Sequence, residues 1–211
     1  MTGSIAQRTV EDFLRQLASD APTPGGGAVA AVAGAAGAGL ISMVCNLTIG
    51  HKGYEETEER MHAILAEAES ARTAFLELAD RDATAFDGVM TAFKMPKETD
   101  AEKAVRSQAI QQGYEQAAVV PLEIGRKASE LMELARETTK VGNANAASDG
   151  ACAAQALSMA VWSATYNVDI NAAALKDHSK ATALRDQVSA LRESARALLD
   201  ATSAAFRSRL G

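Results

Sequence analysis

The sequence has few of the side chains that bind metals or form disulfides. It contains two cysteines and three histidines. The histidines, His51, His62 and His178, show no paired spacing, and Cys45 and Cys152 are far apart in the chain. We therefore expect no metal centre. Both cysteines lie among small apolar residues, a context typical of reduced, buried thiols, with a disulfide or a reactive thiol as the alternative.

Common catalytic motifs and targeting signals are also missing. The sequence has no GxxxxGK phosphate-binding loop and no serine nucleophile elbow. Its formal net charge of -6 argues against nucleic acid as the main partner. No signal peptide precedes the first amphipathic segment, which already carries Glu11, Asp12 and Arg15. These absences predict a cytoplasmic protein.

No stretch alternates between apolar and polar residues as a β-strand does, and there is no internal repeat. Apolar residues recur instead at helical spacing. Thr9 and the Thr99–Glu102 pair provide helix starts, and Pro96 and Pro121 are expected to end or interrupt helices. The predicted helices cover residues 10–17, 28–49, 55–93, 101–118 with a continuation from 121 to 138, 151–168 and 179–207. We predict one all-α domain over residues 1–211, an up-and-down helical bundle.

The longest uncharged run, residues 28–49, is either a buried helix or a membrane span. It is rich in alanine and glycine and poor in leucine and phenylalanine, which favours a buried helix and no membrane contact. Ala30, Gly34 and Ala38 recur every four residues and predict close packing of a neighbouring helix. Asn46 lies late in this run and needs a polar partner, so we expect it to help line a site.

Residues 151–168 form a second nearly uncharged helix, and we place both at the centre of the bundle. The small-residue faces of the two helices amount to more apolar surface than one bundle of this length is expected to hide. The sequence therefore predicts a homodimer with an apolar contact.

The strongest candidate for chemistry is Asp82. It lies on a helical stripe that is otherwise apolar, formed by Phe75, Ala79, Phe86, Val89 and Phe93. A carboxylate among apolar groups has a raised pKa and can act as a general acid or base near neutral pH. The alternative is a structural aspartate paired with a buried lysine, arginine or backbone group.

Three further groups of residues could bind a ligand. Gly25, Gly26 and Gly27 form either a ligand-facing loop or a tight turn before a crowded helix. Asn143 and Asn145 lie in a predicted loop before a helix, and Ser148 and Asp149 follow them. Such side chains can bind the hydrogen-bond donors and acceptors of a heterocycle, or can serve only as turn and capping groups. Lysines at loop ends, Lys52, Lys94 and Lys97, could attract an anionic tail or remain solvated.

Four motifs occur in an informative order along the chain: PTPGGGAVAA, SMVCNLTIGHKGY, DRDATAFDGVMTAFKMPKETDAEK and VGNANAASDG. Together they resemble the C-terminal domain family of formiminotransferase-cyclodeaminases, which includes stand-alone bacterial methenyltetrahydrofolate cyclohydrolases. The resemblance implies an all-helical fold, a homodimer with folate sites at or near the subunit contact, and no cofactor besides the tetrahydrofolate substrate.

The resemblance also implies roles for particular residues. The acid of the family's D-x-x-A-F pattern falls on Asp82, and the glycine loop falls on Gly25–Gly27. The family's G-N and S-D pairs fall on Gly142-Asn143 and Ser148-Asp149. The loop after T-I-G departs from the family pattern, because only Lys52 remains where relatives often have more lysines.

The activity implied is hydrolysis of 5,10-methenyltetrahydrofolate to 10-formyltetrahydrofolate. The alternative is a formimidoyltetrahydrofolate cyclodeaminase that releases ammonia, and a second alternative is a folate-binding helical subunit without turnover. The wording SMVCNLTIG and the lack of a formiminotransferase domain favour the cyclohydrolase. By this resemblance Asn143, Asn145 and Asp149 are expected at the pterin ring, and Lys52 or Lys97 at the glutamate tail.

Overall fold

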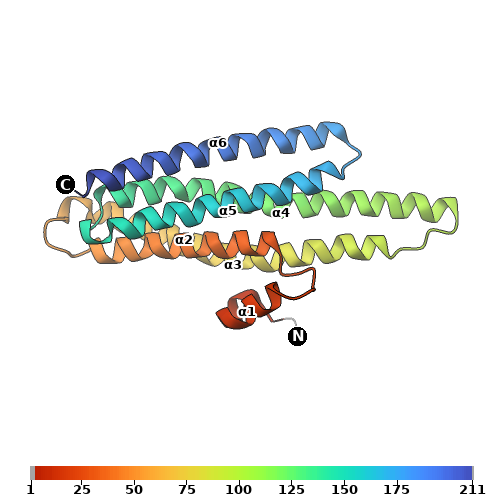
Figure 1. The fold of residues 1–211 in the computed structure, drawn as a ribbon, viewed down its shortest axis with the longest axis horizontal. Coiled ribbons are helices and arrows are strands. Elements are labelled where there is room, and N and C mark those ends of the chain that lie inside the picture. The colour runs from red at the N-terminus through yellow and green to blue at the C-terminus, as the bar shows by residue number, and fades with distance from the viewer. Residues whose placement is uncertain (1–2, 211) are drawn as a thin grey trace.

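The computed structural model describes residues 3–210, and these residues form helices and turns without a β-strand (Figure 1). Three short 3-10 turns, η1 (Ile5–Gln7), η2 (Glu55–Thr57) and η3 (Ala144–Ala146), lie between or before the helices. The α-helices are α1 (Val10–Leu17), α2 (Gly26–Thr48), α3 (Glu58–Phe93), α4 (Asp100–Val141), α5 (Ala147–Ala173) and α6 (His178–Ser208). The predicted all-α fold is therefore confirmed.

Uncharged α2 and nearly uncharged α5 lie side by side at the centre of the bundle. α2 packs against α3 and α5, and α5 packs in addition against α4 and α6. The α3–α4 hairpin is longer than the other helices and projects past them at one end (Figure 1). This confirms the predicted bundle with two central, small-residue-rich helices.

Glycines in α2 allow large side chains of neighbouring helices to reach its backbone. A Cβ placed on Gly34 would lie 2.6 Å from the Phe75 ring, and one on Gly37 would lie 2.7 Å from Cγ of Leu157. Phe75 and Leu157 are fully buried. The glycines therefore set the spacing of α2 from α3 and α5, as the four-residue repeat predicted.

Sequence signals fixed most helix ends correctly. Thr99 and Glu102 form the expected capping box, and the Thr9 hydroxyl accepts a hydrogen bond from the Asp12 N–H. One expectation was wrong, because α4 continues through Pro121 without a break. The capping role considered for Ser148 is not found either, because α5 begins at Ala147 and Ser148 lies inside its first turn.

Pro121 is buried within α4, where its missing N–H leaves the carbonyl of Ala117 without its helical partner. The side-chain amide of Asn171 on α5 donates to that carbonyl at 3.0 Å. This bond from a neighbouring helix compensates for the proline and accounts for the uninterrupted α4.

Within residues 3–210, α2 alone is long and apolar enough to meet the length and hydropathy of a membrane span. Most of its apolar window is buried against the other helices. Its uncharged sequence is therefore accounted for by its position in the core.

Candidate active site

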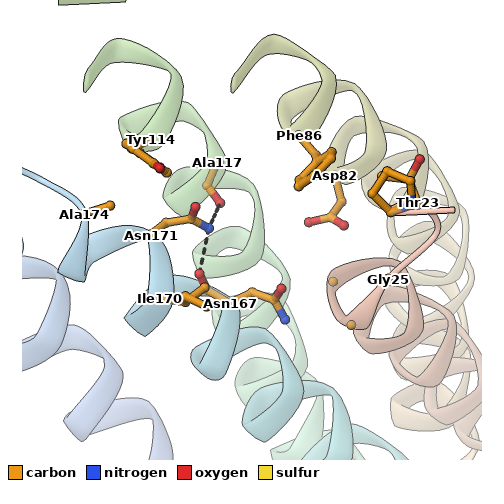
Figure 2. Close-up of a pocket in the computed structure, with 13 residues that line it drawn as sticks. Thr23, Gly25, Asp82, Phe86, Tyr114, Ala117, Asn167, Ile170, Asn171 and Ala174 are labelled. Carbon is orange, nitrogen blue, oxygen red and sulfur yellow. Dashed lines mark hydrogen bonds between the residues drawn. The ribbon is translucent and has the colours of Figure 1, made fainter. Parts of the chain in front are cut away.

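A cavity of about 480 Å³ lies at the N-terminal end of α2, where α2, α3, α4 and α5 surround it (Figure 2). Its size lies within the usual range for a site that binds a small molecule. The lining residues are Pro22, Thr23, Gly25, Gly26, Gly27, Asp82, Phe86, Tyr114, Ala117, Asn167, Ile170, Asn171 and Ala174. The cavity thus unites Asp82 with the three glycines, two of the features singled out from the sequence.

Asp82 projects from α3 toward the first turn of α2 (Figure 2). A Cβ on Gly27 would lie 2.1 Å from Oδ1 of Asp82, so only glycine allows this approach. The predicted glycine loop is in fact the N-cap, Gly25, followed by the first two residues of the helix. Since Gly25 offers no capping side chain, the carboxylate of Asp82 faces N–H groups that the helix itself leaves free.

The environment of Asp82 tunes its acidity. Burial raises the pKa of its carboxyl group to about 6, and the backbone N–H of Ala28 opposes that rise by favouring the anion. None of the ion pairs found within residues 3–210 includes Asp82. The pairing with lysine or arginine considered from the sequence is absent there, and the carboxylate is set to exchange protons near neutral pH.

The opposite wall of the cavity carries two amides and an aromatic ring. Asn167 and Asn171 lie one turn apart on α5, and Tyr114 on α4 flanks them; Phe86 adds a ring on the Asp82 side (Figure 2). Sequence analysis missed both asparagines, and it left Asn171 outside this helix by ending the helix near Val168. Their four-residue spacing in a nearly uncharged helix was the available signal.

Asn143 lies elsewhere, in the turn between α4 and α5. Its side-chain amide donates to the carbonyl of Leu47 at 2.7 Å, and its side-chain oxygen accepts from the N–H of Asn145. Its backbone N–H donates to the Thr48 hydroxyl. This buried side chain joins the end of α2 to the α4–α5 turn.

The remaining predicted binding residues are also remote from the cavity of the same chain. Asn46, Lys52, Asn145, Ser148 and Asp149 lie near the C-terminal end of α2 or the start of α5. The 23 residues of α2 separate that end from Gly26 by about 33 Å at 1.5 Å per residue. Asn46 is exposed, so the buried partner expected for it is absent.

Lys97 lies in the loop between α3 and α4, at the tip of the projecting hairpin. Lys97 follows Asp82 by 15 residues in the chain, which corresponds to roughly 22 Å at the rise of an α-helix. Of the site residues predicted from the sequence, Asp82, Gly25, Gly26 and Gly27 lie together at this cavity within one chain. The other predicted residues lie away from it.

The sequence and the helical fold are similar to those of known proteins. The profile of the formiminotransferase-cyclodeaminase family matches residues 9–190. The chain belongs to this family.

Named relatives and a solved structure agree with that assignment. The chain is 44% identical to a methenyltetrahydrofolate cyclohydrolase of Methylorubrum extorquens, over 81% of this chain and 82% of the relative. It is 33% identical to the formimidoyltransferase-cyclodeaminase of Rattus norvegicus, over 92% of this chain but only 36% of that longer protein. The crystal structure of formiminotetrahydrofolate cyclodeaminase from Thermotoga maritima matches with a TM-score of 0.87 and 28% identity, covering 98% of this chain and all of the other.

Proposed function

We propose that this protein hydrolyses 5,10-methenyltetrahydrofolate to 10-formyltetrahydrofolate in the cavity at Asp82. The observation that carries the proposal is a carboxylate with a pKa near 6 that faces a cavity of suitable size. The identity to a named cyclohydrolase over most of both chains supports this substrate.

The reaction needs one group that first takes a proton and then returns it. The methenyl carbon between N5 and N10 is cationic, and the anionic form of Asp82 favours its binding nearby. Water attacks this carbon and gives a proton to the carboxylate, which forms a neutral tetrahedral adduct. The carboxyl group then protonates N5 as the carbon–N5 bond breaks, and the hydroxyl proton leaves as the formyl C=O forms. The balance is addition of one water and release of one proton.

The raised pKa suits both steps. An ionised carboxylate whose conjugate acid has a pKa near 6 is a stronger base than an ordinary aspartate. Once protonated, it is still acidic enough to give the proton to an amine nitrogen. Gly27 supports this role because it lets the first turn of α2 approach the carboxylate.

A second activity is favoured by the structural match to a formiminotetrahydrofolate cyclodeaminase over the whole of that chain. Such an enzyme closes N10 onto a 5-formimino carbon and expels ammonia through a similar tetrahedral carbon. One acid–base group between N5 and N10 serves either reaction.

We also propose that the protein is a homodimer in the cytoplasm. α2 carries no charged residue, and α5 carries only Asp149 and Asp169. Large apolar side chains nevertheless remain exposed along both helices: Met43, Leu47, Met159, Tyr166 and Ile170. Exposed apolar side chains on two nearly uncharged helices are suited to contact with a second copy of the chain. Both cysteines are free thiols, which suits a reducing compartment.

We further assign an antiparallel arrangement to this dimer. A two-fold axis that crosses the middle of α2 at right angles would set the Gly26 end of one helix beside the Thr48 end of its partner. The partner's Lys52 and Asn46 would then lie near the Asp82 cavity. This arrangement unites the residues that one chain holds about 33 Å apart.

A paired assay tests the proposed function. Purified protein is mixed with 5,10-methenyltetrahydrofolate and its absorbance loss is followed, after subtraction of the uncatalysed rate. A parallel sample receives 5-formiminotetrahydrofolate, and released ammonia is measured. We expect turnover of the methenyl substrate; ammonia release alone would assign the chain as a cyclodeaminase, and binding without either turnover would assign it as a folate-binding subunit.

A further inference from the structure

The cavity wall opposite Asp82 is built around a hydrogen-bonded amide whose orientation is fixed. Asn171 is partly buried on α5, and its side-chain nitrogen donates two hydrogen bonds. One goes to the carbonyl of Ala117 on α4 at 3.0 Å, and the other goes to the carbonyl of Asn167 at 2.8 Å (Figure 2). A backbone carbonyl only accepts, so both partners require the NH₂ end of the amide.

The cause of this orientation lies in α4. Pro121 has no N–H, and its ring pushes against the carbonyl four residues earlier. That carbonyl belongs to Ala117, and it accepts a hydrogen bond from the side-chain amide of Asn171. A proline in one helix thereby fixes an amide on another.

Asn171 lines the cavity, and its side-chain oxygen accepts no hydrogen bond from the residues that the structure describes. Both of its N–H bonds are committed to carbonyls, so the side chain can only accept from a ligand. Asn167, one turn earlier, donates its side-chain nitrogen to the carbonyl of Ser163 at 2.9 Å. No hydrogen bond to either side-chain oxygen is found within residues 3–210. The wall therefore presents two oxygens that accept hydrogen bonds.

We infer that Asn171 is a specificity-determining residue that accepts hydrogen bonds from the N–H edge of the substrate's pterin ring, and that Pro121 is the residue that positions it. The inference rests on the proposed function, since that function supplies the ligand. A reduced pterin has its reacting N5 at one end and its 2-amino and N3–H donors at the other. With N5 at Asp82, the donor edge points across the cavity to α5, where the Asn171 side chain has only its oxygen free for a ligand (Figure 2).

The test is titration calorimetry with 5-formyltetrahydrofolate, a stable reduced folate with the same donor edge. We expect Asn171→Leu to raise Kd about tenfold, the loss typical of one removed hydrogen bond. The matched control is Gln112→Leu, an exposed amide on α4, which should leave Kd unchanged. Equal Kd values for Asn171→Leu and wild type would overturn the inference.

A second ligand isolates the contact itself. The same folate with its 2-amino group replaced by methyl should bind wild type about tenfold more weakly. Asn171→Leu should bind the two ligands alike, a pattern that a purely structural role does not produce. If the variant still distinguishes the ligands as wild type does, Asn171 does not read this edge.

Removal of the proline tests the positioning role. Pro121→Ala restores the helical N–H to Ala117 and should raise the melting temperature, while KM for the methenyl substrate rises severalfold and kcat changes little. Gly88→Ala is the control for stabilisation alone, because nothing lies within 4 Å of a Cβ at this helical glycine. An unchanged KM in Pro121→Ala would contradict the assignment of Pro121.

The outcomes separate this inference from the proposed function. Asn171→Leu leaves the Ala117 carbonyl without a hydrogen-bond donor. If this variant folds poorly for that reason, the double variant Pro121→Ala/Asn171→Leu supplies the missing backbone N–H from residue 121. Weaker folate binding in these variants, without turnover by wild type, would leave the inference standing and reject the hydrolase. Turnover by wild type with unchanged folate binding by the variants would reject the inference alone.

Discussion

Replacement of Asp82 by asparagine should make the protein more stable at neutral pH, even though it removes the proposed catalytic group. The carboxyl group has a folded pKa of about 6 because of burial, whereas an unfolded chain gives an aspartate about 3.9. The folded state therefore binds the proton more tightly than the unfolded state. Its contribution to stability is present below about pH 4 and is lost as the pH rises through about 6.

The magnitude follows from the two pKa values. A difference of about two pKa units, at ~1.36 kcal/mol each, corresponds to roughly 3 kcal/mol. Because the carboxylate is partly open to solvent, this is an upper figure. Asparagine keeps the shape and carries no charge, so Asp82→Asn should be more stable than wild type by up to about 3 kcal/mol near pH 8. The difference should vanish near pH 4.

Urea unfolding followed by circular dichroism, at several pH values and one fixed protein concentration, measures this difference. Asp87→Asn serves as the control, because Asp87 is an exposed carboxylate on the same helix. Its stability should follow wild type at every pH. An Asp82→Asn variant that is less stable than wild type near pH 8, or a gain that does not depend on pH, would refute the desolvated-carboxylate account.

Four further predictions concern activity and assembly. In a pH–rate series, kcat/KM should fall below pH ~6, because the free enzyme needs ionised Asp82. The fall in kcat should come at a lower pH, because the cationic substrate stabilises the Asp82 anion in the enzyme–substrate complex. Steady-state assays of Gly27→Ala should show kcat reduced on the order of 10²-fold, since the new methyl group displaces the carboxylate; a normal kcat would contradict the close approach. Lys52→Ala should raise KM for a polyglutamylated substrate more than for the monoglutamate, and equal effects would reject the tail assignment. Spin labels on Leu47→Cys in a Cys152→Ser background should lie roughly 30 Å apart in the antiparallel dimer. A short separation would indicate parallel α2 helices, and a monomer in light scattering would reject the dimer.

The sequence carried enough information for the helices and for the acid. Helix ends follow from local signals such as Thr9 and the Thr99–Glu102 box, which act within one turn. The central position of α2 follows from its lack of charge. Asp82 stood out because a single carboxylate interrupted an apolar stripe, and burial of that carboxylate raises its pKa.

The rest of the site depends on contacts between helices that no local pattern encodes. Pro121 reads as a helix breaker, but burial and the amide of Asn171 on another helix allow α4 to continue. The loop motif around Asn143 is compatible with a binding loop and with a turn. Only the structure shows that this side chain bonds to the end of α2 and to its own turn.

The most direct test of the central claim is kcat for hydrolysis of 5,10-methenyltetrahydrofolate by wild type and by Asp82→Asn. Asparagine cannot take the proton from water or return it to N5. The account predicts a fall of about 10²–10⁴-fold in kcat, the usual range for loss of general acid–base catalysis. Near-normal turnover by the folded variant would show that the proton carrier is another group.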